Sequence, residues 1–122
     1  MNYTHQIPVH RGEVFMVDLG DYEGRGNSLF GKIRPCCCIS NEKCNTHSNV
    51  LSFVCLSGNT SPSKLKLPTR VLVKANADIK DSTAVCEQII SVPRNAIIRF
   101  VTKLSDETMQ KIDSAIKIQL SL

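Results

Sequence analysis

The sequence lacks two features that would place it in a membrane or outside the cell. No apolar run approaches the roughly 20 residues that a membrane-spanning helix requires. The N-terminal stretch MNYTHQIPVHRGEV contains neither the apolar segment nor the small-residue cleavage site of a secretory signal. We therefore expect a cytoplasmic protein whose cysteines are thiols in a reducing compartment.

The sequence has six cysteines but no C-x-x-C pair, the spacing typical of zinc and thiol redox sites. In a strand, Cys36 and Cys38 would point to one face and Cys37 to the other, so the three cannot share one ligand sphere. Buried cysteine behaves as a small hydrophobe, and we therefore predict a strand interior without a metal. A metal site assembled with His47, or a cysteine nucleophile with His10 or His47 as base, stays open as an alternative.

Internal repeats, low-complexity segments and βαβ alternation are also missing. The 122 residues fit one domain. Residues 1–11 have no regular period, and we expect a leader of the kind that is often poorly ordered, followed by a single domain over residues 12–122.

What is present is a series of short β-rich segments followed by one helical pattern. Residues 105–121 have Ser105 as a helix N-cap, acids in the first turn and apolar residues at helical spacing. This order predicts a mainly β (α+β) fold, a small antiparallel β-barrel with a C-terminal amphipathic helix. A long Gly-rich loop, residues 20–31, follows the first strand. The expected strands are Glu13 to Leu19, Ile33 to Ser40, Val50 to Ser57, Arg70 to Ala75, Thr83 to Val92 and Ile97 to Leu104.

Positive charge is modest in total, +4, but unevenly placed. Lys64, Lys66, Arg70 and Lys74 follow one another without an intervening acid, which fits either a solvated loop or a phosphate-binding surface. Arg34 lies where the Gly-rich loop meets an apolar strand. It is either a solvated strand-end charge or a fixed clamp for phosphate or carboxylate.

The chain resembles the MazF/PemK family of toxin endoribonucleases, most closely its Gram-positive MazF branch. The resemblance rests on RGEVFMVDL, the Gly-rich loop, KIRPCCCISNE, VLSFVCLSG, KLPTRVLV, STAVCEQIISV and the helix LSDETMQKIDSAIKIQL, in this order over residues 11–121. It implies an SH3-like barrel and a homodimer. It also implies metal-independent, sequence-specific cleavage of single-stranded RNA to 2′,3′-cyclic phosphate and 5′-hydroxyl ends, without a cofactor, and a MazE-type antitoxin as partner.

The resemblance also implies a catalytic pair. The family's key arginine falls on Arg34, whose guanidinium can stabilise negative charge on the phosphate. The second catalytic position, a threonine in the family, falls on Ser57, which keeps the hydroxyl but loses the γ-methyl that restricts χ1. The alternative for Ser57 is a turn-capping serine. Ser48 also matches a family position, with a structural role expected.

Further residues are candidates for binding RNA. They are family positions near the groove (Asn41, Glu87, Gln88), loop residues that can contact or stack on bases (Tyr22, Arg25, Phe30) and phosphate contacts (Lys64, Lys66, Arg70). Glu87 and Gln88 could instead orient Arg34 or lie at the dimer interface. Two other functions stay open, a non-catalytic barrel that binds nucleic acid or a partner protein, and a cysteine-based redox or metal sensor.

Overall fold

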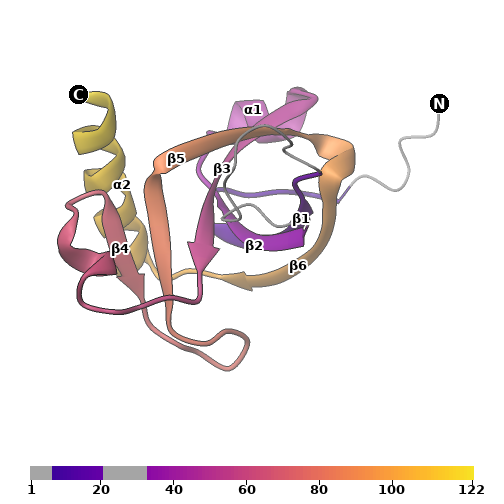
Figure 1. Cartoon of the computed structure of the whole chain (residues 1–122). Coiled ribbons are helices and arrows are strands. Elements are labelled where there is room, and N and C mark those ends of the chain that lie inside the picture. The colour runs from indigo at the N-terminus through magenta and orange to yellow at the C-terminus, as the bar shows by residue number, and fades with distance from the viewer. Residues whose placement is uncertain (1–6, 21–32) are drawn as a thin grey trace.

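The computed structural model describes residues 7–20 and 33–122 of the chain (Figure 1). Each predicted strand is confirmed, with ends within two residues of the expected ones. No helix in these ranges is long and apolar enough to cross a membrane. The elements are β1 (Glu13–Asp18), β2 (Ile33–Cys38), α1 (Glu42–His47), β3 (Val50–Ser57), η1 (Lys64–Lys66), β4 (Arg70–Val73), β5 (Ser82–Pro93), η2 (Arg94–Ala96), β6 (Ile97–Lys103) and α2 (Asp106–Leu120).

The strands form one antiparallel sheet in the order β4-β5-β3-β2-β1-β6. The sheet curls strongly, with β5 and β6 passing around β1 and β2 (Figure 1). Within the described residues, β4 and β6 are edge strands that do not pair with each other. The predicted mainly β (α+β) class is confirmed, and the hydrogen-bonded sheet of the described residues is strongly curled but not closed.

One face of the sheet carries the first part of the core. Phe15, Val17 and Leu19 alternate onto this face from β1 and the residue after it, as the sequence pattern predicts. Phe15 contacts Phe53 edge to face, with ring centroids 6.5 Å apart. Val9 is buried in the same cluster. The concave part of the curled sheet is therefore a packed apolar interior.

The other face is covered by α2. Ser105 caps this helix by accepting a hydrogen bond from the Thr108 amide, and Met109, Ile112 and Ala115 are buried against the sheet. Cys37 belongs to this second cluster, whereas Cys36 and Cys38 belong to the first. The cysteine run thus divides between the two faces, and all three side chains are fully buried.

The segment between β2 and β3 contains a short helix, α1 (Glu42–His47), that was not expected from the sequence. Asn41 caps the helix by accepting a hydrogen bond from the Cys44 amide at 2.9 Å. Arg94 donates to the carbonyl oxygens of Asn45 and Ser48 at the other end. The Asn41 side chain at one end and the Arg94 guanidinium at the other therefore stabilise a helix that is too short to be stable alone.

Candidate active site

The two residues expected to be catalytic lie on neighbouring strands. β2 and β3 pair antiparallel, with Cys36 opposite Cys55 and Cys37 opposite Val54. The ladder ends at the Cys36–Cys55 pair. Arg34 lies two residues from Cys36 on β2 and Ser57 two residues from Cys55 on β3, so strand alternation gives both the face that carries Cys36 and Cys55. A guanidinium and a hydroxyl therefore lie toward the same end of the sheet, beside the loop that follows β3.

The hydroxyl of Ser57 is held by the turn that follows it. Its Oγ accepts a hydrogen bond from the Asn59 amide at 3.2 Å. Thr83, which pairs with Ser57 in the β3–β5 ladder, donates to the Asn59 carbonyl at 2.8 Å. The turn-capping function considered for Ser57 is thus present. It uses the oxygen as acceptor and leaves the O–H able to donate to another group.

Two thiols, those of Cys36 and Cys55, lie two residues from Arg34 on β2 and two residues from Ser57 on β3. The sulfur atoms of Cys36 and Cys55 are 3.5 Å apart, and both residues are buried. Their hydrogen bond lowers the pKa of Cys55, helped by the charge of Arg34, and raises the pKa of Cys36. The other buried thiols show the usual effect of burial, which disfavours the thiolate. Burial raises the pKa of Cys37, and it raises the pKa of Cys86 to about 12.

A second polar cluster lies where β5 bends. The β3–β5 register shifts between Val54 and Leu56, and Glu87 is in the irregular part of β5. Glu87 Oε2 accepts from Arg70 Nε at 2.8 Å and lies 2.6 Å from Arg70 Nη2. Thr69 donates to Oε1 at 3.2 Å. Burial opposes ionisation of Glu87, but the hydrogen bonds and charge of Arg70 outweigh it and lower the pKa.

This cluster accounts for two of the residues that were predicted to bind RNA. Glu87 is bound to Arg70, and Arg70 also donates to the Lys64 carbonyl at 3.2 Å. Gln88, the next residue, has a buried Oε1 without a hydrogen-bond partner within residues 7–20 and 33–122. The Gln88 side-chain oxygen therefore has an unused capacity to accept a hydrogen bond within the described residues.

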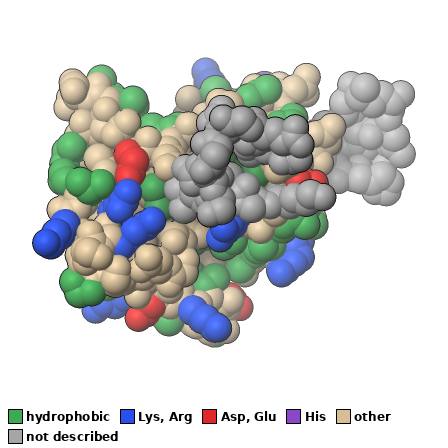
Figure 2. All heavy atoms as spheres, viewed as in Figure 1, with side chains coloured by type: hydrophobic (Ala, Val, Ile, Leu, Met, Phe, Trp, Pro, Cys, Tyr) green, Lys and Arg blue, Asp and Glu red, His purple; other side chains and the backbone are tan. Residues whose placement is uncertain are grey.

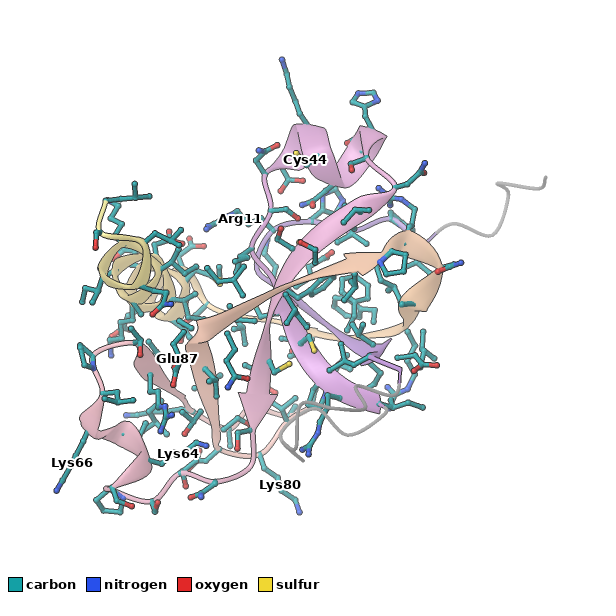
Figure 3. All side chains as sticks on the ribbon, turned by 45° about the horizontal axis from the view of Figure 1, so that its top comes forward. Arg11, Cys44, Lys64, Lys66, Lys80 and Glu87 are labelled. Atoms are coloured by element: carbon teal, nitrogen blue, oxygen red, sulfur yellow. The ribbon has the colours of Figure 1, made fainter. Side chains whose placement is uncertain are left out.

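Lys64 and Lys66 lie in η1, after the turn that follows Ser57. Figure 3 shows both on the side of the molecule toward which the end of β3 points, with Lys66 directed outward. Figure 2 shows Lys and Arg side chains gathered over the side on which β4 lies. Lys64 and Lys66 therefore lie on the same side of the molecule as the end of β3.

The other predicted RNA contacts do not join this group. Asn41 follows the opposite end of β2, and its side chain caps α1, which Figures 1 and 3 show at the far end of β3 from Ser57. Tyr22, Arg25 and Phe30 lie outside the described residues. Asn41 and Arg34 thus lie toward opposite ends of β2.

No cluster of three or more His, Cys, Asp or Glu side chains suited to a metal ion occurs in the part of the chain that the structure describes. All six cysteines are free thiols. His10, one of the two histidines considered as a partner for cysteine, contacts Glu42 at 3.1 Å on the surface.

Sequence reasoning missed the contacts that connect distant segments. Asn59 and Thr83 fix the Ser57 turn, and the Ser-Gly-Asn sequence was the available local signal. Cys55 was named as a cysteine, but its position opposite Cys36 depends on strand register, for which the sequence carries no local signal.

Comparison with known proteins gives consistent results. Residues 10–120 match the model of the PemK-like, MazF-like toxins of type II toxin–antitoxin systems. The chain is 34% identical to an endoribonuclease MazF of Staphylococcus saprophyticus, over 93% of this chain and 92% of the relative.

Solved structures share the fold. A MazF from Deinococcus radiodurans has a TM-score of 0.77 at 11% identity, covering 95% of this chain and 99% of that one. An endoribonuclease in complex with its cognate antitoxin, from mycobacterial species, has a TM-score of 0.74 at 23% identity, covering 93% and 96%.

Proposed function

The chain belongs to the PemK-like, MazF-like toxin family of type II toxin–antitoxin systems, and from this premise we propose that it is a sequence-specific endoribonuclease with Arg34 and Ser57 at its catalytic centre. The observation that supports the proposal is the pairing of Cys36 with Cys55, which lies two residues from Arg34 on β2 and two residues from Ser57 on β3. The substrate is single-stranded RNA, and the family relationship supports mRNA as the target.

The proposed reaction uses the 2′-hydroxyl of the RNA as nucleophile. It attacks the adjacent phosphorus in line with the departing 5′-oxygen and leaves a 2′,3′-cyclic phosphate and a 5′-hydroxyl. Because the nucleophile is part of the substrate, the enzyme's task is positioning, charge stabilisation and proton transfer. Arg34 holds the non-bridging oxygens as negative charge develops on them. A guanidinium is a poor general base and suits this role better.

Ser57 supports the same step as a hydrogen-bond donor. Its oxygen already accepts from the Asn59 amide, so the hydroxyl proton is directed away from that bond. It can then donate to a phosphate oxygen placed against Arg34. The Asn59 bond restrains the serine hydroxyl and compensates for the γ-methyl that threonine would supply.

Binding of the RNA extends from this centre. Lys64 and Lys66 are proposed as phosphate contacts, which position the strand without reading its sequence. Gln88 is proposed as a base contact, as its family position implies, because an amide can hydrogen-bond the edge of an unstacked base. Arg70 and Glu87 are proposed to hold the β4–β5 part of this surface in place.

The proposal includes the partners expected for this family. The toxin domain, residues 12–122, forms a homodimer in the cytoplasm, and a MazE-type antitoxin binds and inhibits it. The mycobacterial relative, solved with its cognate antitoxin, supports this expectation.

The test is cleavage of a long single-stranded RNA by the purified protein in EDTA, with the new 5′ ends mapped by their hydroxyl group. Cleavage at one short motif with 5′-hydroxyl products is expected. Retention of the RNA without cleavage would instead assign a non-catalytic binding module. Cleavage that stops in EDTA and returns with a divalent metal would contradict the metal-independent reaction.

A further inference from the structure

Cys36 and Cys55 form a cross-strand thiol pair inside the core. They are direct partners in the β2–β3 register, and their sulfur atoms are 3.5 Å apart. Opposite residues in antiparallel strands have Cα atoms about 4.5–5.5 Å apart, which lies within the range of about 4.4–6.8 Å that disulfides span. The pair can therefore be joined with small movements of the backbone.

Among the described strand pairs, none of the other four cysteines faces a cysteine. Cys86 lies in the irregular part of β5, with its sulfur 3.9 Å from the Ala84 carbonyl oxygen. Cys37 points to the opposite face, where its sulfur contacts Met109 at 3.8 Å. Cys38 contacts Ser40 and Asn45. Cys44 is exposed on α1, at the other end of β3 from Ser57. The register thus selects one pair among six thiols.

We propose that Cys36 and Cys55 are a redox modification site, at which hydrogen peroxide forms an internal disulfide that lowers the RNA-cleaving activity. Formation of the disulfide follows from the geometry of the pair, whereas the effect on activity rests on the proposed function. The bond would lie two residues from Arg34 on β2 and two residues from Ser57 on β3.

The chemistry balances with peroxide as the two-electron oxidant. The Cys55 thiolate attacks one peroxide oxygen, forms a sulfenic acid and releases hydroxide, which takes up the proton that the thiol lost. The Cys36 thiol then attacks the Cys55 sulfur, forms the S–S bond and releases water. Two thiols and one peroxide give one disulfide and two waters. The positive charge of Arg34 and the hydrogen bond from Cys36 favour the Cys55 thiolate that starts the sequence.

Burial sets the rate and the choice of oxidant. Cys36 is 0% and Cys55 is 2% exposed, so bulky disulfides cannot reach them in the folded state. Peroxide is small and can enter during local openings of the strand ends. We therefore expect slow oxidation by peroxide and slow, complete reversal by dithiothreitol.

The disulfide acts on the candidate active site by moving strands β2 and β3, which carry Arg34 and Ser57. The sulfurs must approach from 3.5 Å to the S–S bond length of about 2.0 Å, which draws β2 and β3 together behind Arg34 and Ser57. A displacement of about 1 Å at a catalytic group can cost ~100-fold in rate. We expect oxidation to lower the cleavage rate at least about 10-fold.

The experiment uses full-length protein carrying Cys44→Ser, which removes the exposed thiol. After treatment with hydrogen peroxide, intact mass is expected to fall by two hydrogens. Non-reducing tryptic mapping is expected to find peptides 33–43 and 44–64 joined by a disulfide. Because Cys44 is replaced, peptide 44–64 can form this disulfide only through Cys55. Fragmentation of the joined peptides identifies Cys36 as its partner. A bridge to Cys37 or Cys38, or peroxide adducts without a bridge, would overturn the proposal.

Two further variants in the same background separate the disulfide from general damage. Cys55→Ala removes the pair, and Cys37→Ala removes an equally buried thiol from the same strand on the other face. Circular dichroism confirms that each is folded. Peroxide is expected to inhibit the Cys37→Ala protein reversibly and to spare Cys55→Ala. Equal inhibition of both would refute the link to activity. If the untreated protein lacks RNase activity, the proposed function fails, while the mass and mapping results still decide whether the disulfide forms.

Discussion

The Arg70–Glu87 pair permits a quantitative prediction for the variant Glu87→Gln. The side chains are 20% and 21% exposed, so the pair lies between the surface and the core. Exposed ion pairs contribute about 0–1 kcal/mol, and removing one partner of a buried pair costs about 3–5 kcal/mol. Glutamine keeps one acceptor for Thr69 but turns an amide group toward the guanidinium. We therefore expect the free energy of unfolding to fall by about 2 kcal/mol, close to the value for a charged hydrogen bond.

The assay is urea denaturation of both proteins at pH 7, with a thermal melt as a second measurement. A loss of about 2 kcal/mol corresponds to a melting temperature lower by ~6–10 °C for a chain of this length. The matched control is Glu107→Gln, because Glu107 is 83% exposed and lies 4.0 Å from Lys111 on α2. Its loss of unfolding free energy is expected to be smaller, about 1 kcal/mol or less, from the surface pair and the helix dipole.

The pH dependence gives an independent check. The pKa of Glu87 is lowered in the folded state, so the unfolded chain takes up the proton first as the pH falls. The pair therefore stabilises the protein fully above the unfolded pKa of about 4.3, and this stabilisation is lost as the pH falls through the lower, folded pKa. The difference between wild type and Glu87→Gln should shrink over that window. A constant difference from pH 7 to pH 3, or equal losses in both variants at pH 7, would refute the reasoning.

Three other substitutions test individual contacts. Ser57→Thr is expected to cleave RNA at close to the wild-type rate, whereas Ser57→Ala is expected to be about 100-fold slower, because it removes a donor to the developing charge; equal rates for both in a single-turnover assay would remove Ser57 from the mechanism. Asn41→Ala is expected to lower the free energy of unfolding by about 1 kcal/mol through loss of the α1 cap, and Asn41→Ser to restore most of it; a lower RNA affinity in a titration of Asn41→Ser would instead show a base contact. Gly12→Ala is expected to cost about 1–2 kcal/mol in urea denaturation, because Gly12 has φ +89° and an added Cβ would lie 3.3 Å from Met109; an unchanged midpoint would contradict this.

Much of the fold could be predicted because its signals are local. Alternation of Phe15, Val17 and Leu19 against Val14 marks β1, and the cap at Ser105 with apolar residues at helical spacing marks α2. The helix α1 was missed because five of its six residues are polar and they have no amphipathic period. Its one local signal was Asn41 followed by Glu42, the cap and acidic first turn of a helix.

The residues of the candidate site came from the family resemblance, whereas its contacts required the fold. That Arg34 and Ser57 lie toward the same end of two paired strands follows from the β2–β3 pairing. The binding of Glu87 to Arg70 arises from the irregular part of β5, where four residues of one strand oppose one residue of the other. Such a bulge depends on the curvature of the whole sheet, and no short stretch of sequence encodes it.

The central claim, that Arg34 stabilises charge on the phosphate opposite Ser57, is tested most directly by single-turnover cleavage of one RNA by Arg34→Ala in EDTA. The matched control is Arg99→Ala, which removes the same charge from an exposed position on β6. Loss of a preorganised donor predicts a rate about 100- to 1,000-fold lower for Arg34→Ala, with RNA affinity nearly retained and Arg99→Ala close to wild type. Equal rates for the two variants, with the same 5′-hydroxyl ends, would contradict the account.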